Sequence, residues 1–384
     1  MELEFTAEQE ELRAQVRAVL SRECPIGLVR EIVEKGRTAD QLWAQMVELD
    51  WPALTVAESY GGLGGTFTDL AVVVEELGRV MAPGPLFPTL TQFAPVVREV
   101  GTDRQCHSWL GAVAAGTLTG TLALAEQAGS WDLAAVRTTA RADGDGWVLE
   151  GDKHFVIEAG RVDQIAVVAR DDHGLGVWVV PASGVTIAPI HTLDGSRQLA
   201  TVHLRNVALP DSSRLGPPAA DASAQLERAV EESTVALALE TVGVCQTIFD
   251  IALAYAKDRR QFGVPIGSFQ AIKHKFANML VALERARVAA YFGVATIDEN
   301  DDRRALAASM AKAAAGDCQA LLAQEGIQSL GGIGYTWEHD MHLYVKRAKS
   351  GEPLLGSAHE HRLRIADLVG VSQTRQGDAA ALGR

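Results

Sequence analysis

The spacing of apolar residues changes twice along this chain, and these changes limit the folds it can adopt. From the start to about residue 115, apolar residues recur at the period of an α-helix, as Leu12 and Val16 do in the first run. Between about 117 and 215 the period becomes two, which is the alternation of a β-strand. From about 222 onward the helical period returns in long stretches. We therefore expect a helical region, a β region and a second helical region, in that order.

These regions predict an α+β fold with three domains. Residues 1–115 form an N-terminal helical domain, residues 116–221 a middle antiparallel β-barrel or β-sandwich domain, and residues 222–370 a C-terminal four-helix bundle. Residues 371–384 are small and polar, and we expect a disordered tail there. The four long bundle helices are expected at about 222–260, 267–297, 302–330 and 338–368.

Local signals mark the ends of several elements. Thr6 precedes Gln9 by three residues, which is a capping-box pattern at a helix start. The glycines within residues 58–65 predict a loop, and Asp143-Gly-Asp-Gly146 predicts a hairpin turn. Strand candidates lie at 121–125, 147–150, 164–169, 176–180, 185–189 and 199–204.

The composition argues against several classes of protein. The formal net charge of −14 argues against a protein that binds the phosphate backbone of nucleic acid, because such proteins need a basic surface. The start of the chain is acidic and amphipathic, and no run of eighteen apolar residues occurs, so we expect neither a signal peptide nor a membrane span. The scattered cysteines predict free thiols, no metal site and a cytoplasmic protein: Cys24, Cys106, Cys245 and Cys318.

The segment 255–270 lies where one long predicted helix ends and the next begins. Gly263 and Pro265 stop the first helix. Arg259 and Gln261, close to this break, can present a guanidinium and an amide to a diphosphate. The alternative interpretation is a helix C-terminus whose basic residues complement the helix dipole.

A second segment, Gln328-Ser-Leu-Gly-Gly-Ile-Gly-Tyr335, places three glycines at another predicted helix end. Glycines in such a position let the backbone approach another group closely. The alternative interpretation is a simple loop that ends the helix, which is the more common meaning of a lone glycine cluster.

Together the two segments resemble the two signatures of the acyl-CoA dehydrogenase family, R-x-x-F-G-x-P-I-x-x-F-Q and Q-x-x-G-G-x-G-Y. The resemblance covers nearly the whole chain. It implies a tetramer that oxidises an acyl-CoA with FAD, shares each FAD across a dimer interface and passes electrons to an electron-transfer flavoprotein. It also implies the residues that would contact the ADP half of a neighbouring subunit's FAD: Arg259, Gln261, Phe262, Gln270, Gln328, Gly331 and Gly332.

The resemblance fails at the catalytic base. The family's base is a glutamate twenty residues after the aromatic residue that closes the glycine segment, and the matching position here is Leu355. Some relatives place the glutamate twenty-six residues before the signature arginine, which is Ser233 here. A general base needs a group that accepts a proton and titrates, and neither side chain offers one. The sequence therefore predicts no catalytic residue at either position.

Glutamates close to Ser233 do not replace the missing base. At about 100° per residue, Glu231 and Glu232 point away from the Ser233 direction. Glu240 returns to nearly the same helix face but lies about 10 Å further along the axis. We expect such acidic side chains on an exposed helical stretch to be solvated.

The predicted β domain also departs from the family at its flavin-facing segments. Where the family reads T-E-P-G-A-G-S-D, this chain has Ala125 at the threonine position and Trp131 at the serine position. Where the family reads W-I-T-N, Phe155 keeps an aromatic ring but Ile157 replaces the threonine. Losing each hydrogen bond to the flavin or its phosphates costs about 0.5–1.5 kcal/mol. The alternative is that Trp131 simply fills the space.

The leading hypothesis is a non-catalytic subunit that completes its partner's FAD site. The assembly would be a heterotetramer of two related chains, two copies each, a form that occurs in this family among bacterial enzymes acting on steroid side-chain CoA esters. Residues 335–339 and Leu355-Gly-Ser357 resemble that branch, so the expected substrate class is an acyl-CoA or steroid-CoA thioester of fatty acid or side-chain β-oxidation. The alternatives are a self-sufficient homotetrameric dehydrogenase with an atypical base, a flavin-free CoA-thioester-binding scaffold, and a flavin-using monooxygenase.

Overall fold

A computed structural model of the chain describes residues 5–371, and the expected tail at 372–384 lies outside the described residues. The first part of the chain is helical, as expected. The capping box is present, because Thr6 Oγ1 accepts from Gln9 N at 3.2 Å and Gln9 Oε1 accepts from Thr6 N at 3.1 Å. The helices are α1 (Ala7–Glu23), α2 (Ile26–Lys35), α3 (Asp40–Glu48), α4 (Phe67–Arg79), α5 (Leu86–Pro88), α6 (Ala94–Val100) and α7 (Asp103–Ala114).

The middle of the chain forms a seven-stranded sheet with the order β1-β4-β2-β3-β7-β6, and β5 pairs with β4. The pairings β2·β3, β3·β7, β4·β5 and β6·β7 are antiparallel, as predicted. The pairings β1·β4 and β2·β4 are parallel, because β4 comes to lie between β1 and β2 instead of following either through a hairpin. The strands are β1 (Gly120–Ala123), β2 (Thr139–Asp143), β3 (Gly146–Ile157), β4 (Gln164–Asp171), β5 (Gly174–Pro181), β6 (Thr186–Ile190) and β7 (Leu199–Pro210).

All six predicted strand regions are present, and the sequence interpretation missed one strand, β2. The predicted turn at Asp143 to Gly146 joins β2 to β3, with these two residues paired across it. Of the side chains of β2 only that of Ala140 is buried, so the strand lacks the alternation of apolar and polar residues that marks a half-buried strand.

The rest of the chain forms the bundle of α8 (Ser223–Asp258), α9 (Gln270–Asp298) and α10 (Arg304–Leu330), completed by α11 (Met341–Gly351) and α12 (Ala358–Leu368). The single helix predicted at 338–368 is therefore wrong. Pro353 removes a backbone donor, and Leu355 and Gly356 adopt φ of 56° and 96°, which no α-helix allows. Ser357 then caps α12 by accepting from Glu360 N.

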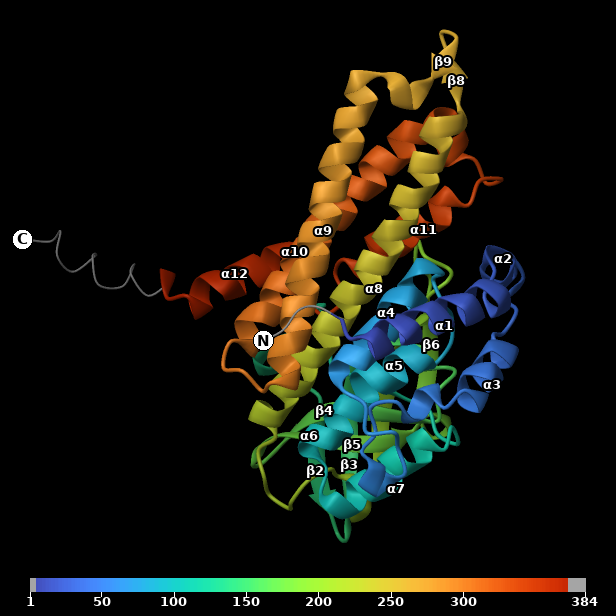
Figure 1. The fold of residues 1–384 in the computed structure, drawn as a ribbon. Helices are drawn as coiled ribbons and strands as arrows, with labels where there is room; N and C mark the ends of the chain where they lie inside the picture. The colour runs from blue at the N-terminus through green and yellow to red at the C-terminus, as the bar shows by residue number, and fades with distance from the viewer. Residues whose placement is uncertain (1–4, 372–384) are drawn as a thin grey trace, which may run out of the picture.

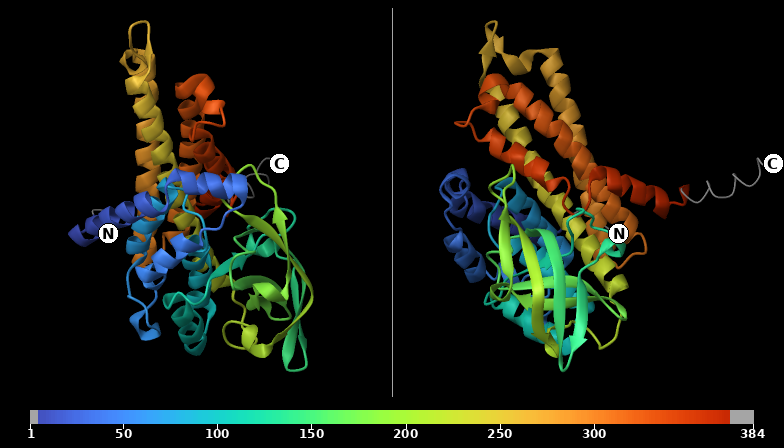
Figure 2. Two further views of the ribbon diagram at one scale, coloured as in Figure 1. Left: turned by 90° about the vertical axis from the view of Figure 1, so that its right-hand side faces the viewer. Right: turned by 180° about the vertical axis from the view of Figure 1, so that it is seen from behind.

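Figures 1 and 2 show the bundle extending beyond the other two domains, which are grouped around the lower half of α8. Helix α8 crosses α4 closely because two glycines face backbone across the contact. A Cβ on Gly78 would lie 2.2 Å from Glu240 O, and a Cβ on Gly243 would lie 2.1 Å from Glu75 O. The N-terminal domain is therefore packed directly against the longest bundle helix.

Helix α8 is the one described helix that is long and apolar enough to cross a membrane, with a mean hydropathy of 1.5 over its most apolar stretch. Most of that stretch, 78%, is buried inside the protein, so its apolar side chains form the bundle core. All four cysteines are free and buried, as predicted. The described residues contain no group of three or more possible metal-ligating side chains.

Candidate functional site

The first signature segment forms the tip of the bundle. Arg259 caps α8 in an extended conformation, and the chain then makes a two-stranded hairpin of β8 (Arg260–Gln261) and β9 (Val264–Pro265). Phe262 and Gly263 form its turn with φ of 51° and 81°. The Phe262 side chain is 92% exposed, and its ring only touches the edge of Phe269, so most of a large aromatic surface is open.

The second signature segment ends α10. Gly331 takes a φ of 67° at the helix C-cap, and a short 3₁₀-helix follows over Gly331–Tyr335. A Cβ built on Gly331 or Gly332 would meet nothing within 4 Å, so the space in front of this backbone is open. Both signature segments lie at the same end of the bundle (Figure 1).

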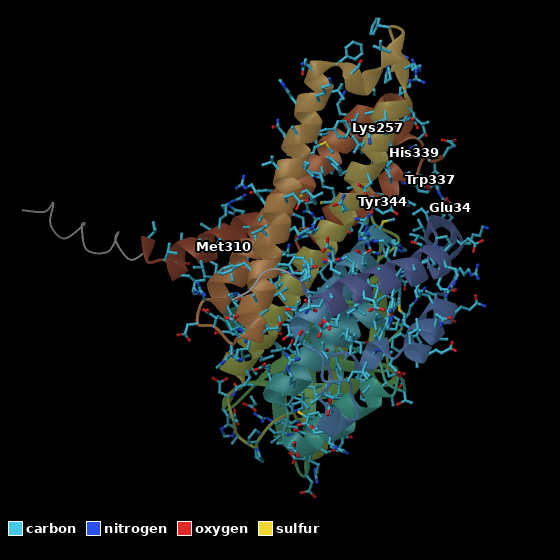
Figure 3. All side chains as sticks on the ribbon, viewed as in Figure 1. Glu34, Lys257, Met310, Trp337, His339 and Tyr344 are labelled. Carbon is cyan, nitrogen blue, oxygen red and sulfur yellow. The ribbon has the colours of Figure 1, made fainter. Side chains whose placement is uncertain are left out.

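The side chains at this tip suit the ADP half of a dinucleotide. The polar residues named by the resemblance are all exposed there, and none is tied up in an ion pair within the described part of the chain. Guanidinium and amide donors bind phosphate oxygens, and an exposed ring offers a surface for a base to stack on. Figure 3 places Lys257 of α8 and His339, from the loop before α11, on one side of the bundle near this tip. The exposed polar residues are Arg259, Gln261, Gln270 and Gln328.

The position of the family's base lies far from this tip, in the break between α11 and α12. Leu355 is 3% exposed and lines a cavity of about 470 Å³ between the bundle and the loop that follows β1. Val230, near the start of α8, lines the same cavity. Arg259 follows Val230 by 29 positions along α8, and an α-helix rises about 1.5 Å per residue, so the two residues are about 44 Å apart.

The break around Leu355 is held by side chains from three different elements. Burial lowers the pKa of Lys312 to about 8. Burial also lowers the pKa of His361 to about 4, against the effect of its bond to the Leu355 carbonyl, so the imidazole is neutral and donates through Nε2. The bonds to the backbone are Lys312 Nζ to Glu352 O (2.7 Å), Trp131 Nε1 to Pro353 O (2.9 Å) and His361 Nε2 to Leu355 O (2.9 Å).

Ser233 does not face this cavity. Its hydroxyl is fully buried and donates to Thr91 O at 2.6 Å, on the side of the N-terminal domain. The face of α8 that lines the cavity carries Glu227, Val230 and Thr234 instead. Neither position named by the resemblance therefore brings a carboxylate to the cavity.

The expectation that the glutamates of α8 are solvated is wrong. Glu231, Glu232 and Glu240 are 6%, 2% and 4% exposed. Their surroundings are apolar on nearly every side of α8, so each charge needs a buried or half-buried partner. The ion pairs are Glu231 with Arg304 (2.8 Å), Glu232 with Arg98, and Glu240 with Arg197 and Arg347 (3.0 Å to Arg347). All three carboxylates therefore join helices and domains, and none is free to accept a proton from a substrate.

The β-domain residues that would meet a flavin ring do not fit one. Ala125 and Ile157 are buried apolar side chains without a hydrogen-bonding group. The Trp131 indole spans from the loop after β1 to Pro353, so it closes the place that a serine would leave open. Phe155 has a φ of 58° at a register shift in β3, and its ring packs near Gly129 of the same loop.

The sequence did not reveal three buried polar residues near the cavity beside Leu355. Lys153 is fully buried and pairs with Glu126 at 2.8 Å, which fixes the start of the loop that carries Trp131. Lys312 stands alone in the alanine-rich run 311–315, and because lysine is usually exposed, this pattern does not mark its side chain as buried. No pattern in the sequence marks His361, because its role depends on the break between two helices.

Comparisons with known proteins agree with this architecture. The chain matches the N-terminal, middle and C-terminal domains of acyl-CoA dehydrogenases at residues 6–117, 121–207 and 224–370. It is 31% identical to acyl-CoA dehydrogenase IpdE2 of Mycobacterium tuberculosis, over 94% of this chain and 97% of that protein. It is 30% identical to the human mitochondrial short-chain specific acyl-CoA dehydrogenase, over 82% of this chain and 78% of that protein.

A solved structure described as a variant of the Tcur3481-Tcur3483 steroid ACAD superposes with a TM-score of 0.85. It is 28% identical in sequence, and the match covers 96% of this chain and 99% of that one. The matches over most of the chain and the order of the three domains agree with one another. The chain belongs to the acyl-CoA dehydrogenase family, whose members are FAD-dependent oxidoreductases of acyl-CoA.

Proposed function

We propose that this chain is a non-catalytic subunit of an acyl-CoA dehydrogenase and that it completes the FAD site of a related catalytic subunit. The observation that carries the proposal is the contrast between its two half-sites. The bundle tip presents open backbone and exposed polar side chains, whereas the cavity at the other end has Leu355 at the family's base position and Trp131 at the position of the family's serine.

The distance between the half-sites supports sharing of the cofactor. The tip and the cleft of one chain are about 44 Å apart along α8, which is longer than an extended FAD. A nucleotide held at this tip must therefore place its flavin ring on another chain. Arg259, Gln261, Phe262, Gln270, Gln328, Gly331 and Gly332 would contact its ADP half, and the bound FAD would supply the hydride acceptor.

The relatives support a proposal for the substrate class. IpdE2 is described as an acyl-CoA dehydrogenase, and the superposed steroid ACAD pairs two named proteins. We extend this to a cytoplasmic heterotetramer with two copies of each of two related chains, acting on an acyl-CoA or steroid-CoA thioester with an electron-transfer flavoprotein as acceptor.

Counting flavin tests the proposal. Expressed alone, this chain should bind little flavin and should not oxidise acyl-CoA. Co-expressed with a related chain that carries the glutamate, it should co-purify with one FAD per two chains and give an active complex. A yellow homotetramer that turns over acyl-CoA without any partner would refute the non-catalytic role, and a complex without flavin would favour the scaffold.

Arg259→Ala tests the half-site itself. This change should remove most FAD from the complex while the two chains still co-purify, because a charged donor to the diphosphate is lost. Arg104→Ala is the matched control, since Arg104 is an exposed arginine of α7 in another domain. Equal flavin content in both variants would contradict the assignment.

One observation favours the self-sufficient alternative enough to test it. Glu227 lies on the wall of the cavity beside Leu355 and forms no ion pair within the described part of the chain. If this chain oxidises acyl-CoA by itself, Glu227→Gln should abolish that activity. If only the complex with a related chain oxidises acyl-CoA, Glu227→Gln in this chain should leave the kcat of the complex unchanged.

A further inference from the structure

Trp337 lies in the loop that joins the 3₁₀-helix Gly331–Tyr335 to α11, and side chains of α11 fix its orientation. The imidazole of His342 stacks on the indole, with ring centroids 4.6 Å apart and planes inclined by 22°. The ammonium of Lys346 lies 4.3 Å from the centre of the same indole. These contacts set the direction in which the indole N–H points.

Two side chains of α2, in the N-terminal domain, bind the same loop. Trp337 Nε1 donates to Glu34 Oε1 at 3.1 Å, and Figure 3 shows these two residues beside each other. Arg30 Nη1 donates to Trp337 O at 2.9 Å, and Arg30 Nε lies 2.6 Å from Asp340 Oδ1. Arg30 and Glu34 also pair with each other at 3.2 Å. Helix α2 is therefore bonded directly to a loop of the bundle, through both the backbone and the side chain of Trp337.

The backbone between this loop and α10 is the open backbone of the bundle tip. The 3₁₀-helix that carries Gly331 and Gly332 has Gly334 as its one buried residue. A short segment with so few buried contacts is mobile unless its ends are fixed. One end is fixed by α10, whose last residue, Leu330, is buried, and the other end leads into the loop held through Trp337. The bonds from α2 therefore limit the positions that the backbone of Gly331 and Gly332 can take.

We propose that Arg30 and Glu34 are positioning residues of the ADP half-site, which act through Trp337 on the backbone of Gly331 and Gly332. A backbone that is already ordered binds a ligand more tightly, because the cost of ordering it is not paid on binding. The inference rests on the proposed function, since it requires a nucleotide at the bundle tip. It adds the N-terminal domain to a half-site whose other residues all belong to the bundle.

ADP is the probe, and it is titrated by calorimetry into the purified full-length chain alone. Arg30→Leu should weaken ADP about 10-fold, because the loop must then be ordered when the ligand binds. Arg37→Leu is the matched control, since Arg37 follows the same helix but pairs with Glu31 rather than with the loop. Equal ADP affinity of these two variants, with Arg259→Ala still abolishing binding, would overturn this inference alone. A wild-type chain that binds no ADP, or an Arg259→Ala chain that binds it equally well, would contradict the half-site and this inference together.

Glu34 is tested through its bond to the indole. Glu34→Gln keeps an oxygen that accepts from Trp337 Nε1, so ADP should bind as it does to the wild type. Glu34→Leu removes the acceptor and should weaken ADP, and Trp337→Phe, which removes the donor, should have a similar effect. Because the two changes break one bond, the double variant should bind ADP no more weakly than either single variant. Additive losses, or equal affinities of Glu34→Leu and Glu34→Gln, would refute the role of this bond.

Amide hydrogen exchange of the chain without ligand separates lost positioning from a weakened fold. In Arg30→Leu, the amides of residues 331–340 should exchange faster than in the wild type, because the loop opens more often. The amides of residues 250–258, in the last turns of α8 at the same end of the bundle, should exchange as in the wild type. Unchanged exchange in 331–340, or an equal increase in both segments, would overturn the proposal.

Discussion

Replacing Glu240 with glutamine separates a structural role from a catalytic one. Glu240 lies at the junction of all three domains, where it pairs with Arg197 just before β7 and with Arg347 of α11. Arg347 also contacts Asp194 at 3.0 Å and donates to Ser196 O at 3.0 Å. The change Glu240→Gln keeps the shape of the side chain but removes the one charge that both arginines share.

The expected cost follows from burial. Both arginine side chains and Glu240 are 4–6% exposed, so solvent cannot compensate for the lost charge. Breaking such a buried pair costs about 3–5 kcal/mol. Because Asp194 still neutralises Arg347 and the glutamine oxygen can still accept one bond, we expect a value near about 3 kcal/mol. For a chain of 384 residues, whose unfolding entropy is about 0.8 kcal/mol/K, this lowers Tm by about 4 °C.

Calorimetry of the purified chain at one scan rate measures this shift, and acyl-CoA oxidation is followed in parallel after co-expression with the related chain of the proposed complex. Glu10→Gln is the control, because Glu10 forms an exposed pair with Arg13 and should not change Tm measurably. We expect Glu240→Gln to melt earlier and to retain its kcat below the melting range. An unchanged Tm with lost turnover would refute the reasoning and would make Glu240 the missing base.

Two further predictions concern stability. Gly243→Ala should destabilise the chain by about 1–3 kcal/mol in thermal unfolding, because the new Cβ meets Glu75 O at 2.1 Å. Gly27→Ala on α2 is the control: its Cβ meets nothing within 4 Å, so it should not destabilise the chain. Equal melting of the two variants would contradict the close packing of α4 on α8. Burial lowers the pKa of His361 from 6.5 to about 4. Between pH 4 and 6.5 the folded chain therefore binds fewer protons than the unfolded chain. The free energy of unfolding should fall by up to about 3 kcal/mol as the pH drops from about 6.5 to 4. Unfolding measured across this range should show a shallower pH dependence for His361→Gln, and an identical slope would contradict the assignment.

The order of helical and β regions could be predicted because the period of apolar residues is a local property. The bundle tip could be predicted too, since Gly263, Pro265 and the glycines of 331–334 end helices for local reasons. Strand β2 could not, because only Ala140 in it is buried. The domain boundaries at 115/116 and 221/222 and the roles of the tip residues stay predictions.

The buried carboxylates of α8 show why periodicity fails in a core. Every residue from Ala229 to Cys245 is buried, so this part of the helix has no polar face from which exposure can be inferred. An acidic residue in such a run implies a partner from elsewhere in the fold, which no sequence window contains. The break at 353–356 was visible in principle, because Pro353 and Gly356 both disfavour a helix.

Under the proposed function, the geometry of α8 would let one half-site change without the other. Its first turns line the cleft, its last turn carries Arg259, and about 44 Å of helix separates them. Between these ends, ion pairs through Glu231, Glu232 and Glu240 fix the helix to the other elements. A side chain introduced at the cleft, such as Trp131 or Leu355, therefore alters local contacts while the tip keeps its position. In the proposed role, the tip would therefore stay available to a neighbouring chain although the chemistry of the chain's own cavity is lost.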